Sequence, residues 1–174
     1  MELKILTKEN EILRKKSEPI VEITDEIKTL CNDMVSLLKS SEGIGLSAPQ
    51  IGKNIRLFII NILDESHVFI NPEILEKSDE FIISPEKCLS LPGEECFVLR
   101  RKALRFCYMD ISGEKKTVEV IDYIAYVIQH EIDHLDGILV QDRHDEPLKI
   151  EFNRNLEEIK RKKLNKKKKS KKGK

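Results

Sequence analysis

Apolar and polar positions alternate along this chain in patterns that predict both helices and strands. After Thr24, a residue suited to an N-cap, apolar side chains recur at helical spacing and predict a helix over 25–41. Runs rich in β-branched and aromatic residues predict strands at 56–62, 67–74, 80–84, 96–110 and 115–121. The glycines and proline of GIGLSAPQIG, 43–52, predict an irregular loop between the helix and the first strand.

Helical spacing returns at Asp122 and ends at Gly137, a residue typical of a helix C-terminus. The segment 138–142 is predicted as a last strand. Pro147 then opens a C-terminal helix over 147–163, which leads into a strongly basic end.

Charge divides the chain into two parts. Residues 160–174 hold eleven of the 31 basic residues and no acidic ones, so this segment carries +11 and residues 1–159 carry −11. A block of like charge without apolar periodicity is predicted to be a disordered tail after a single folded domain. The tail suits either binding to phosphates or solubility alone, and composition does not separate the two.

The first residues lack the apolar core of a signal peptide, and no stretch approaches the roughly 18 apolar residues of a membrane span. The four cysteines are too few for the framework of a small secreted domain. We therefore expect reduced thiols, no membrane association and a cytoplasmic location of the bacterial type, with an organelle as the alternative.

The segment HEIDH, 130–134, lies inside the helix predicted from Asp122. His130 and His134 are four residues apart, so their rings share one helix face and can bind one metal ion. Glu131, beside them, is able to move protons to and from a water held by that ion. The alternative is a pair of solvated surface histidines.

Catalytic metal sites of this kind need a third protein ligand. Among the cysteines, the chemistry favours Cys88 only modestly over Cys96, because Cys88 lies in a turn-like segment. Tyr123, Tyr126 and Val127 fall on the histidine face, where they predict either a slot for an unbranched side chain such as methionine or ordinary core packing.

Three segments resemble the motifs of the peptide deformylase family, in the same order. These are GIGLSAPQ (43–50), EKCLS (86–90) and QHEIDHLDG (129–137), against the family patterns GxGxAAPQ, EGCLS and HExDH. The resemblance implies that Cys88, His130 and His134 hold a divalent metal, natively iron(II), with zinc, nickel or cobalt as substitutes. Together with the pattern, it predicts a single α+β domain, 1–159, of mostly antiparallel strands around a central helix carrying HEIDH, with N- and C-terminal helices.

The implied activity is removal of the formyl group from N-formylmethionine on nascent peptides, by a monomer that meets its substrate near the ribosome. Glu131 would move the proton, and the Gln50 side-chain amide and Leu89 backbone N–H would stabilise the oxyanion. The expected substrate-binding residues are Ile44, Gly45, Lys87, Tyr123, Tyr126 and Val127. An ion cluster of Arg100 with Glu86 and Asp133 is expected to hold the cysteine segment against the helix.

Three departures from the family patterns accompany this resemblance. Ser47 replaces an alanine, which we expect to be mild, whereas Lys87 replaces a glycine and either narrows the cleft or points to solvent. Asp122 stands where a glycine often precedes the helix. The alternatives are an inactive, ribosome- or RNA-associated relative, and an HExxH metallopeptidase that depends on neither Cys88 nor Gln50.

Overall fold

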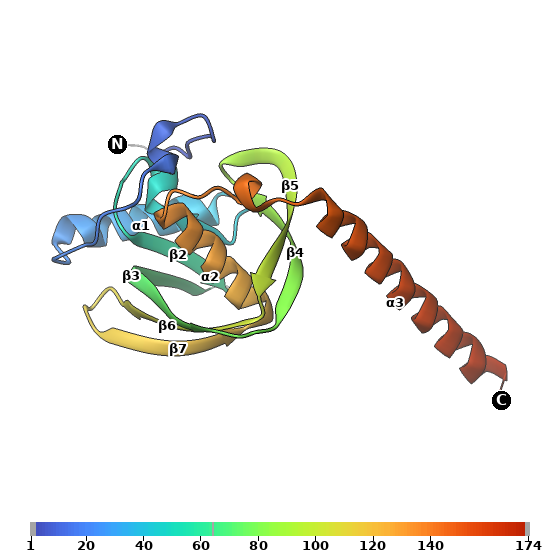
Figure 1. Ribbon diagram of the computed structural model, residues 1–174. Helices are drawn as coiled ribbons and strands as arrows, with labels where there is room; N and C mark the ends of the chain where they lie inside the picture. The colour runs from blue at the N-terminus through green and yellow to red at the C-terminus, as the bar shows by residue number, and fades with distance from the viewer. Residues whose placement is uncertain (1–2, 64, 173–174) are drawn as a thin grey trace.

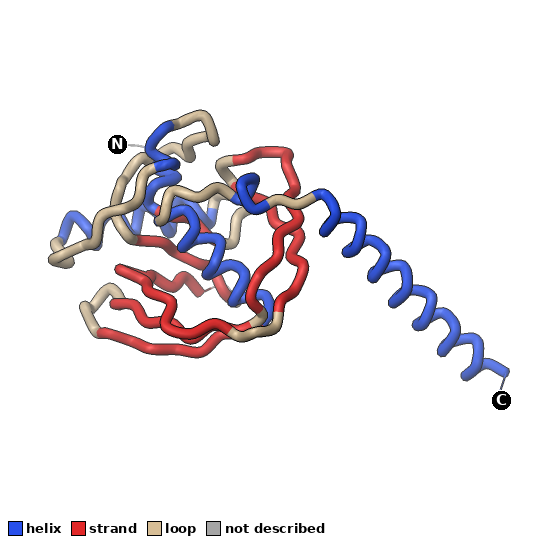
Figure 2. Tube along the Cα trace, viewed as in Figure 1, coloured by secondary structure: helices blue, strands red, loops and turns tan. Residues whose placement is uncertain are grey.

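Two antiparallel sheets form most of the body of the protein in a computed structural model, which describes residues 3–63 and 65–172. The larger sheet has the strand order β1-β2-β3-β6-β7, and neighbouring strands are antiparallel throughout. Its strands are β1 (Gly45–Ser47), β2 (Leu57–Ile62), β3 (Glu65–Lys77), β6 (Ala103–Met109) and β7 (Lys115–Ile121). Figures 1 and 2 show these strands curving around a central helix. The predicted α+β fold class is thereby confirmed.

The smaller sheet is a two-stranded ribbon of β4 (Phe81–Cys88) and β5 (Leu91–Arg101). The single strand predicted over 96–110 is wrong, because the chain bends at Lys102 and continues into the other sheet as β6. The pairing of β4 with β5 shifts register between Lys87 and Cys88, directly before the turn. Such an irregularity re-aims a side chain at a strand end, and here the side chain is that of Cys88.

Helix α2 (Asp122–Leu135) contacts strands of both sheets and is the central helix expected from the sequence. Its apolar face packs against Phe58, Phe69 and Phe106 of the larger sheet. Asp122 has φ 51°, a left-handed conformation that glycine adopts more readily, which explains why this position suits glycine. Gly137, at φ 74°, follows the last turn as predicted.

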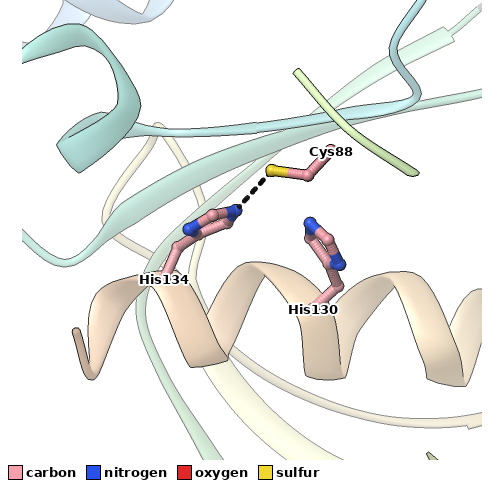
Figure 3. A group of neighbouring side chains, drawn as sticks. All are labelled: Cys88, His130 and His134. Carbon is pink, nitrogen blue, oxygen red and sulfur yellow. Dashed lines mark hydrogen bonds between the residues drawn. The ribbon is translucent and has the colours of Figure 1, made fainter. Parts of the chain in front are cut away.

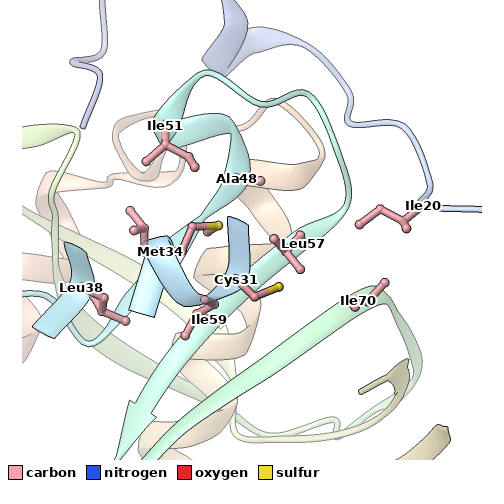
Figure 4. Close-up of a cluster of buried hydrophobic side chains, with 10 residues drawn as sticks. Ile20, Cys31, Met34, Leu38, Ala48, Ile51, Leu57, Ile59 and Ile70 are labelled. Atoms are coloured by element: carbon pink, nitrogen blue, oxygen red, sulfur yellow. The ribbon is translucent and has the colours of Figure 1, made fainter. Parts of the chain in front are cut away.

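Helix α1 (Asp25–Lys39) packs on the other part of the larger sheet. The Thr24 hydroxyl accepts a hydrogen bond from the Ile27 N–H at 3.4 Å, which confirms the predicted N-cap. Figure 4 shows buried side chains of α1 meeting those of β2 and β3. This cluster supports the segment 43–52, which is a short strand, β1, followed by the 3₁₀ helix η2 (Ala48–Ile51).

The C-terminal part differs from the prediction at 138–142, and its helix is longer than the one predicted over 147–163. The expected strand at 138–142 is wrong, because Val140–Arg143 form the 3₁₀ helix η3. Another 3₁₀ helix, η1 (Glu11–Arg14), lies near the N-terminus. Helix α3 (Glu146–Lys172) runs through most of the segment 160–174, for which disorder was expected. Lysine has a high helix propensity, so a helix already nucleated upstream extends into the basic segment.

The start of α3 is held to the body by Phe152, whose ring lies 5.5 Å from that of Phe97 on β5. Beyond this contact the helix projects away from the body (Figure 1). None of the helices in the described part of the chain has the length and hydropathy that a membrane crossing requires.

Candidate metal centre and active site

Cys88, His130 and His134 come together although they lie on separate elements. One sulfur and one ring nitrogen from each histidine lie within 4.8 Å of one another, and Figure 3 shows all three side chains converging above α2. The Cys88 Sγ is 3.2 Å from the His134 Nε2. Within the described residues this is the cluster suited to a metal ion, and Cys96 is not part of it. The choice of Cys88 over Cys96 therefore has a geometric basis.

His130 is oriented by a carboxylate behind it. Its Nδ1 lies 2.9 Å from the Glu86 Oε2, so Nδ1–H donates this bond and Nε2 is left to face the cluster. Burial by itself raises the pKa of Glu86, but its bonds to Arg100 and His130 outweigh burial and lower the pKa to about 2. Glu86 is thus a fixed negative charge behind the ligand.

The cluster suits a divalent cation on three grounds. Burial lowers the pKa of His130, but the bonds to Cys88 and Glu86 and the charge of Glu131 raise it to about 10. The negative surroundings therefore favour a cation at Nε2, either a proton or, in its place, a metal ion. Burial and nearby positive charges lower the pKa of His134 well below its usual value, so its imidazole is neutral and able to bind metal. Thiolate and imidazole are also the donors that zinc and iron(II) accept.

Glu131 lies next to the cluster on the side that faces β1. It is 3% exposed, and its Oε2 is buried without a hydrogen-bond partner among the described residues. Burial raises the pKa of Glu131 to about 7, against the opposing effect of His130. A Cβ atom on Gly45 would lie 2.2 Å from the Glu131 Oε1, so only glycine at 45 leaves room for this carboxylate. An unpaired buried carboxylate with this pKa is a candidate proton acceptor.

Gln50 presents its amide N–H₂ to the cluster. Its Oε1 accepts hydrogen bonds from the Ser47 backbone N–H at 2.9 Å and the Ser47 hydroxyl at 3.0 Å. Its Nε2 is therefore the end that lies 3.6 Å from the Cys88 Sγ and 3.2 Å from the Ser90 Oγ. A donor of known direction thus lies beside the metal-binding atoms.

A cavity of about 550 Å³ opens onto the cluster. The side chain of Lys87 is exposed, so it lies at the rim and does not fill the cavity. Tyr123 is 54% exposed and also lies near the mouth, whereas Tyr126 and Val127 are partly buried. Leu89 lines this cavity. So do all the residues predicted to bind substrate, which are Ile44, Gly45, Lys87, Tyr123, Tyr126 and Val127.

Arg100 joins the cysteine strand to α2, as the sequence predicted. Its guanidinium donates two bonds of 2.8 Å to Glu86 and one of 2.6 Å to the Asp133 Oδ2, and all three residues are buried. Sequence reasoning missed Arg143, which donates two further bonds of 2.6 Å to Asp133 from η3. Nothing in the local pattern identifies Arg143, because it reaches Asp133 only through the turn that follows α2.

Replacing Arg100 with methionine is expected to lower the free energy of unfolding by about 3 kcal/mol. The substitution leaves the buried carboxylates of Glu86 and Asp133 short of a partner, and such losses typically cost 3–5 kcal/mol. The measurement is urea unfolding of the metal-loaded protein. The matched control is Arg105→Met, whose partner Glu76 is 66% exposed, and which should cost below about 1 kcal/mol. Equal losses in the two variants would show that the buried cluster contributes no special stability.

A second missed feature is the pair Ser47 and Gln50. The spacing Ser-x-x-Gln at 47–50 is that of a capping box, in which the glutamine side chain bonds back to the N-cap backbone, as it does in η2. This signal was present in the sequence, where Ser47 was treated only as a small replacement for alanine.

The fold and the site together define a metal-dependent hydrolase in which two histidines of one helix and a cysteine of a neighbouring strand form the candidate ligand set. The family profile described as polypeptide deformylase matches residues 2–149, and the chain belongs to this family. The peptide deformylase of Borreliella burgdorferi is 42% identical over 142 residues, which cover 80% of this chain and 86% of that protein.

Solved structures agree with this assignment. The crystal structure of peptide deformylase from Thermotoga maritima superimposes with a TM-score of 0.81 at 33% identity, covering 83% of this chain and 99% of that one. A peptide deformylase from Synechococcus elongatus in complex with actinonin gives a TM-score of 0.80 at 33% identity, covering 82% and 79% of the two chains. The deformylase fold therefore extends over most of the chain.

Proposed function

We propose that this chain removes the formyl group from the N-terminal formylmethionine of newly made polypeptides and releases formate. The observation that carries the proposal is the convergence of three kinds of group on one cavity. These are the Cys88, His130 and His134 donors, the unpaired carboxylate of Glu131, and the Gln50 amide N–H₂. Hydrolysis of an amide needs an electrophilic centre, a proton acceptor and an oxyanion donor, and the site offers candidates for each.

Cys88, His130 and His134 would hold the cation, and we propose iron(II) as the native ion. Zinc, nickel or cobalt would take its place in some preparations, because the same donor set suits them. When bound, the ion supplies a Lewis acid that polarises a carbonyl oxygen and lowers the pKa of a water molecule. Glu86 supports this by fixing the His130 ring so that Nε2 faces the cluster.

Glu131 would accept the proton of the attacking water and deliver it to the departing amine. The water oxygen forms a bond to the formyl carbon, the carbon–nitrogen bond breaks, and the products are formate and a free N-terminal amine. A pKa of about 7 suits a group that both takes and returns a proton near neutral pH.

The Gln50 Nε2 and the Leu89 backbone N–H would stabilise the oxygen that gains negative charge during the attack. Leu89 occupies the turn directly after Cys88 and lines the cavity, and its side chain packs beside Gly43. The direction of the Gln50 amide is fixed before substrate arrives, and such preorganised donors contribute most to catalysis.

The cavity walls would bind the methionine side chain and the backbone that follows it. Tyr126 and Val127 offer partly buried apolar surface on the His130 face of α2, with Tyr123 nearer the mouth. Ile44 and Gly45 would align the substrate backbone along β1, and Lys87 would contact residues further along the peptide at the rim.

The test is an anaerobic assay of formate release from formyl-Met-Ala-Ser, with metal analysis of the same sample. Anaerobic handling matters because a ferrous ion beside a thiolate is open to oxidation. Full metal loading without formate release would refute the proposal. Cleavage of unformylated peptides in its place would favour a metallopeptidase.

We further propose that the basic end of α3 binds ribosomal RNA, so that a monomeric enzyme in a bacterial-type cytoplasm meets nascent chains as they emerge. The support is a helix that projects from the body and a terminal segment of charge +11 (Figure 1).

Removing residues 160–174 is expected to leave turnover of formyl-Met-Ala-Ser unchanged and to weaken ribosome binding. Because the basic side chains release counterions from phosphates, binding by the full chain should fall steeply with salt, and binding by the shortened chain less steeply. The measurement is cosedimentation with ribosomes across a salt series. Affinity that is unchanged by the truncation and independent of salt would contradict the proposal.

A further inference from the structure

We propose that the Ser47 hydroxyl is a positioning group that locks the Gln50 amide in the orientation needed to donate to the reacting oxygen. The inference rests on the proposed function, in which the Gln50 Nε2 is an oxyanion donor. Ser47 is not among the metal-binding residues or the residues that line the cavity, so it would act through a neighbouring side chain. That side chain is either Gln50 or Glu131, because the Ser47 hydroxyl also lies within hydrogen-bond reach of the Glu131 carboxylate.

Both hydrogen-bond donors of Ser47 point at the same oxygen. Its backbone N–H lies 2.9 Å from the Gln50 Oε1 and its hydroxyl 3.0 Å from the same atom. Ser47 is fully buried and Gln50 is 1% exposed, so no solvent competes for these bonds. Two donors on Oε1 occupy both of its lone pairs and leave Nε2 as the end directed toward Cys88 and Ser90.

The opposite amide orientation is disfavoured by the same contacts. A half-turn about the last side-chain bond of Gln50 would place its N–H₂ against the buried Ser47 backbone N–H, so that two donors would face each other. The Ser47 hydroxyl would have to give up its own donation and rotate to accept from the amide. The half-turn would also present an oxygen, which cannot donate, to the reacting oxygen.

With alanine at 47, as in the family pattern GxGxAAPQ, the backbone N–H would remain and the hydroxyl would be lost. Gln50 would then keep one of its two anchors. The serine of this chain thus adds a second hydrogen bond that restrains the Gln50 side chain. Ser47 lies where β1 ends and η2 begins, at a buried capping turn.

Removing this hydroxyl should change turnover more than binding. In Ser47→Ala we expect kcat for formate release to fall about two- to tenfold, the range that corresponds to one net hydrogen bond, with KM unchanged. The matched control is Ser17→Ala, which deletes a hydroxyl that is equally buried but unpartnered among the described residues, and which should leave kcat unchanged. Melting temperatures of the metal-loaded variants confirm that each is folded.

A double-mutant cycle separates action through Gln50 from action through the neighbouring Glu131. In a Gln50→Leu background, Ser47→Ala should cause no further loss of kcat, because the group that Ser47 holds is absent. An equal loss in both backgrounds, or no loss in the single variant, would overturn the proposal.

A direct readout of the Gln50 side chain does not depend on formate release. In the zinc-loaded, ¹⁵N-labelled protein, hydrogen exchange of the Gln50 side-chain N–H₂ should be about two- to tenfold faster in Ser47→Ala than in wild type. Ser17→Ala should leave this rate unchanged. An unchanged rate in Ser47→Ala would refute the positioning role even in an active enzyme. Absence of formate release by the wild type would refute the proposed function alone, and the exchange measurement would still decide the role of Ser47.

Discussion

Replacing Glu131 with glutamine is expected to lower kcat for formate release by about 10²- to 10⁴-fold while the protein keeps its fold and its metal. Glutamine preserves the shape of the side chain in the space that Gly45 leaves, but it has no carboxylate to accept the water's proton. Its neighbours His130 and His134 are unchanged, so the ligand set stays complete. Anaerobic kinetics on samples of measured metal content would test this expectation.

The control for this substitution is Glu119→Gln on β7, which removes the same charge from an exposed position outside the cavity. It should leave kcat unchanged. If Glu131→Gln retained full activity with full metal occupancy, another group would have to move the proton, and the role proposed for Glu131 would be wrong. If it lost its metal, the fall in kcat would report on metal binding instead of proton transfer.

The order of elements could be predicted because most of them carry their pattern locally. The HEIDH helix is an example: the spacing of His130 and His134 places both rings on one face wherever that helix packs. The bend at Lys102 could not be predicted, because 96–110 is an unbroken strand pattern. Its division between two sheets depends on pairing with β4 on one side and with β3 and β7 on the other.

The third ligand illustrates the same limit. Cys88 and Cys96 are both buried and both lie on the β4–β5 ribbon, so side-chain chemistry alone hardly separates them. The register shift before Cys88 turns its sulfur toward α2, and a register shift depends on how two strands pair. The family resemblance supplied what local physics did not.

The basic segment 160–174 is a different case, because its disorder stays a prediction. Like charges were expected to prevent structure in 160–174, yet α3 continues to Lys172. Repulsion between like charges is weakened by solvent and salt, whereas each residue added to an existing helix needs no new nucleation. A helical arm directs its charge along one axis, which is the property that the proposed ribosome contact would use.

Replacing Cys88 with alanine is expected to reduce metal affinity by more than about 100-fold and to bring formate release close to background. Loss of a group that only hydrogen-bonds a metal ligand commonly lowers metal affinity 10- to 100-fold. Cys88 would itself be a ligand, so its loss should cost more. Its sulfur, 3.2 Å from the His134 Nε2, brings the negative charge that a cation shared with two neutral imidazoles needs. The measurement is competition with a chromogenic chelator under anaerobic conditions, followed by activity at saturating metal.

Cys96→Ala is the matched control, because Cys96 is also a buried cysteine, 5% exposed, in the same apolar cluster as Cys88. It removes the same sulfur volume, so any loss of packing should appear in both variants as a similar fall in the free energy of unfolding. Only Cys88→Ala should also lose the metal. If Cys96→Ala lost metal to the same extent, packing of the ribbon and not thiolate ligation would control the site, and Cys88 would not be the third ligand.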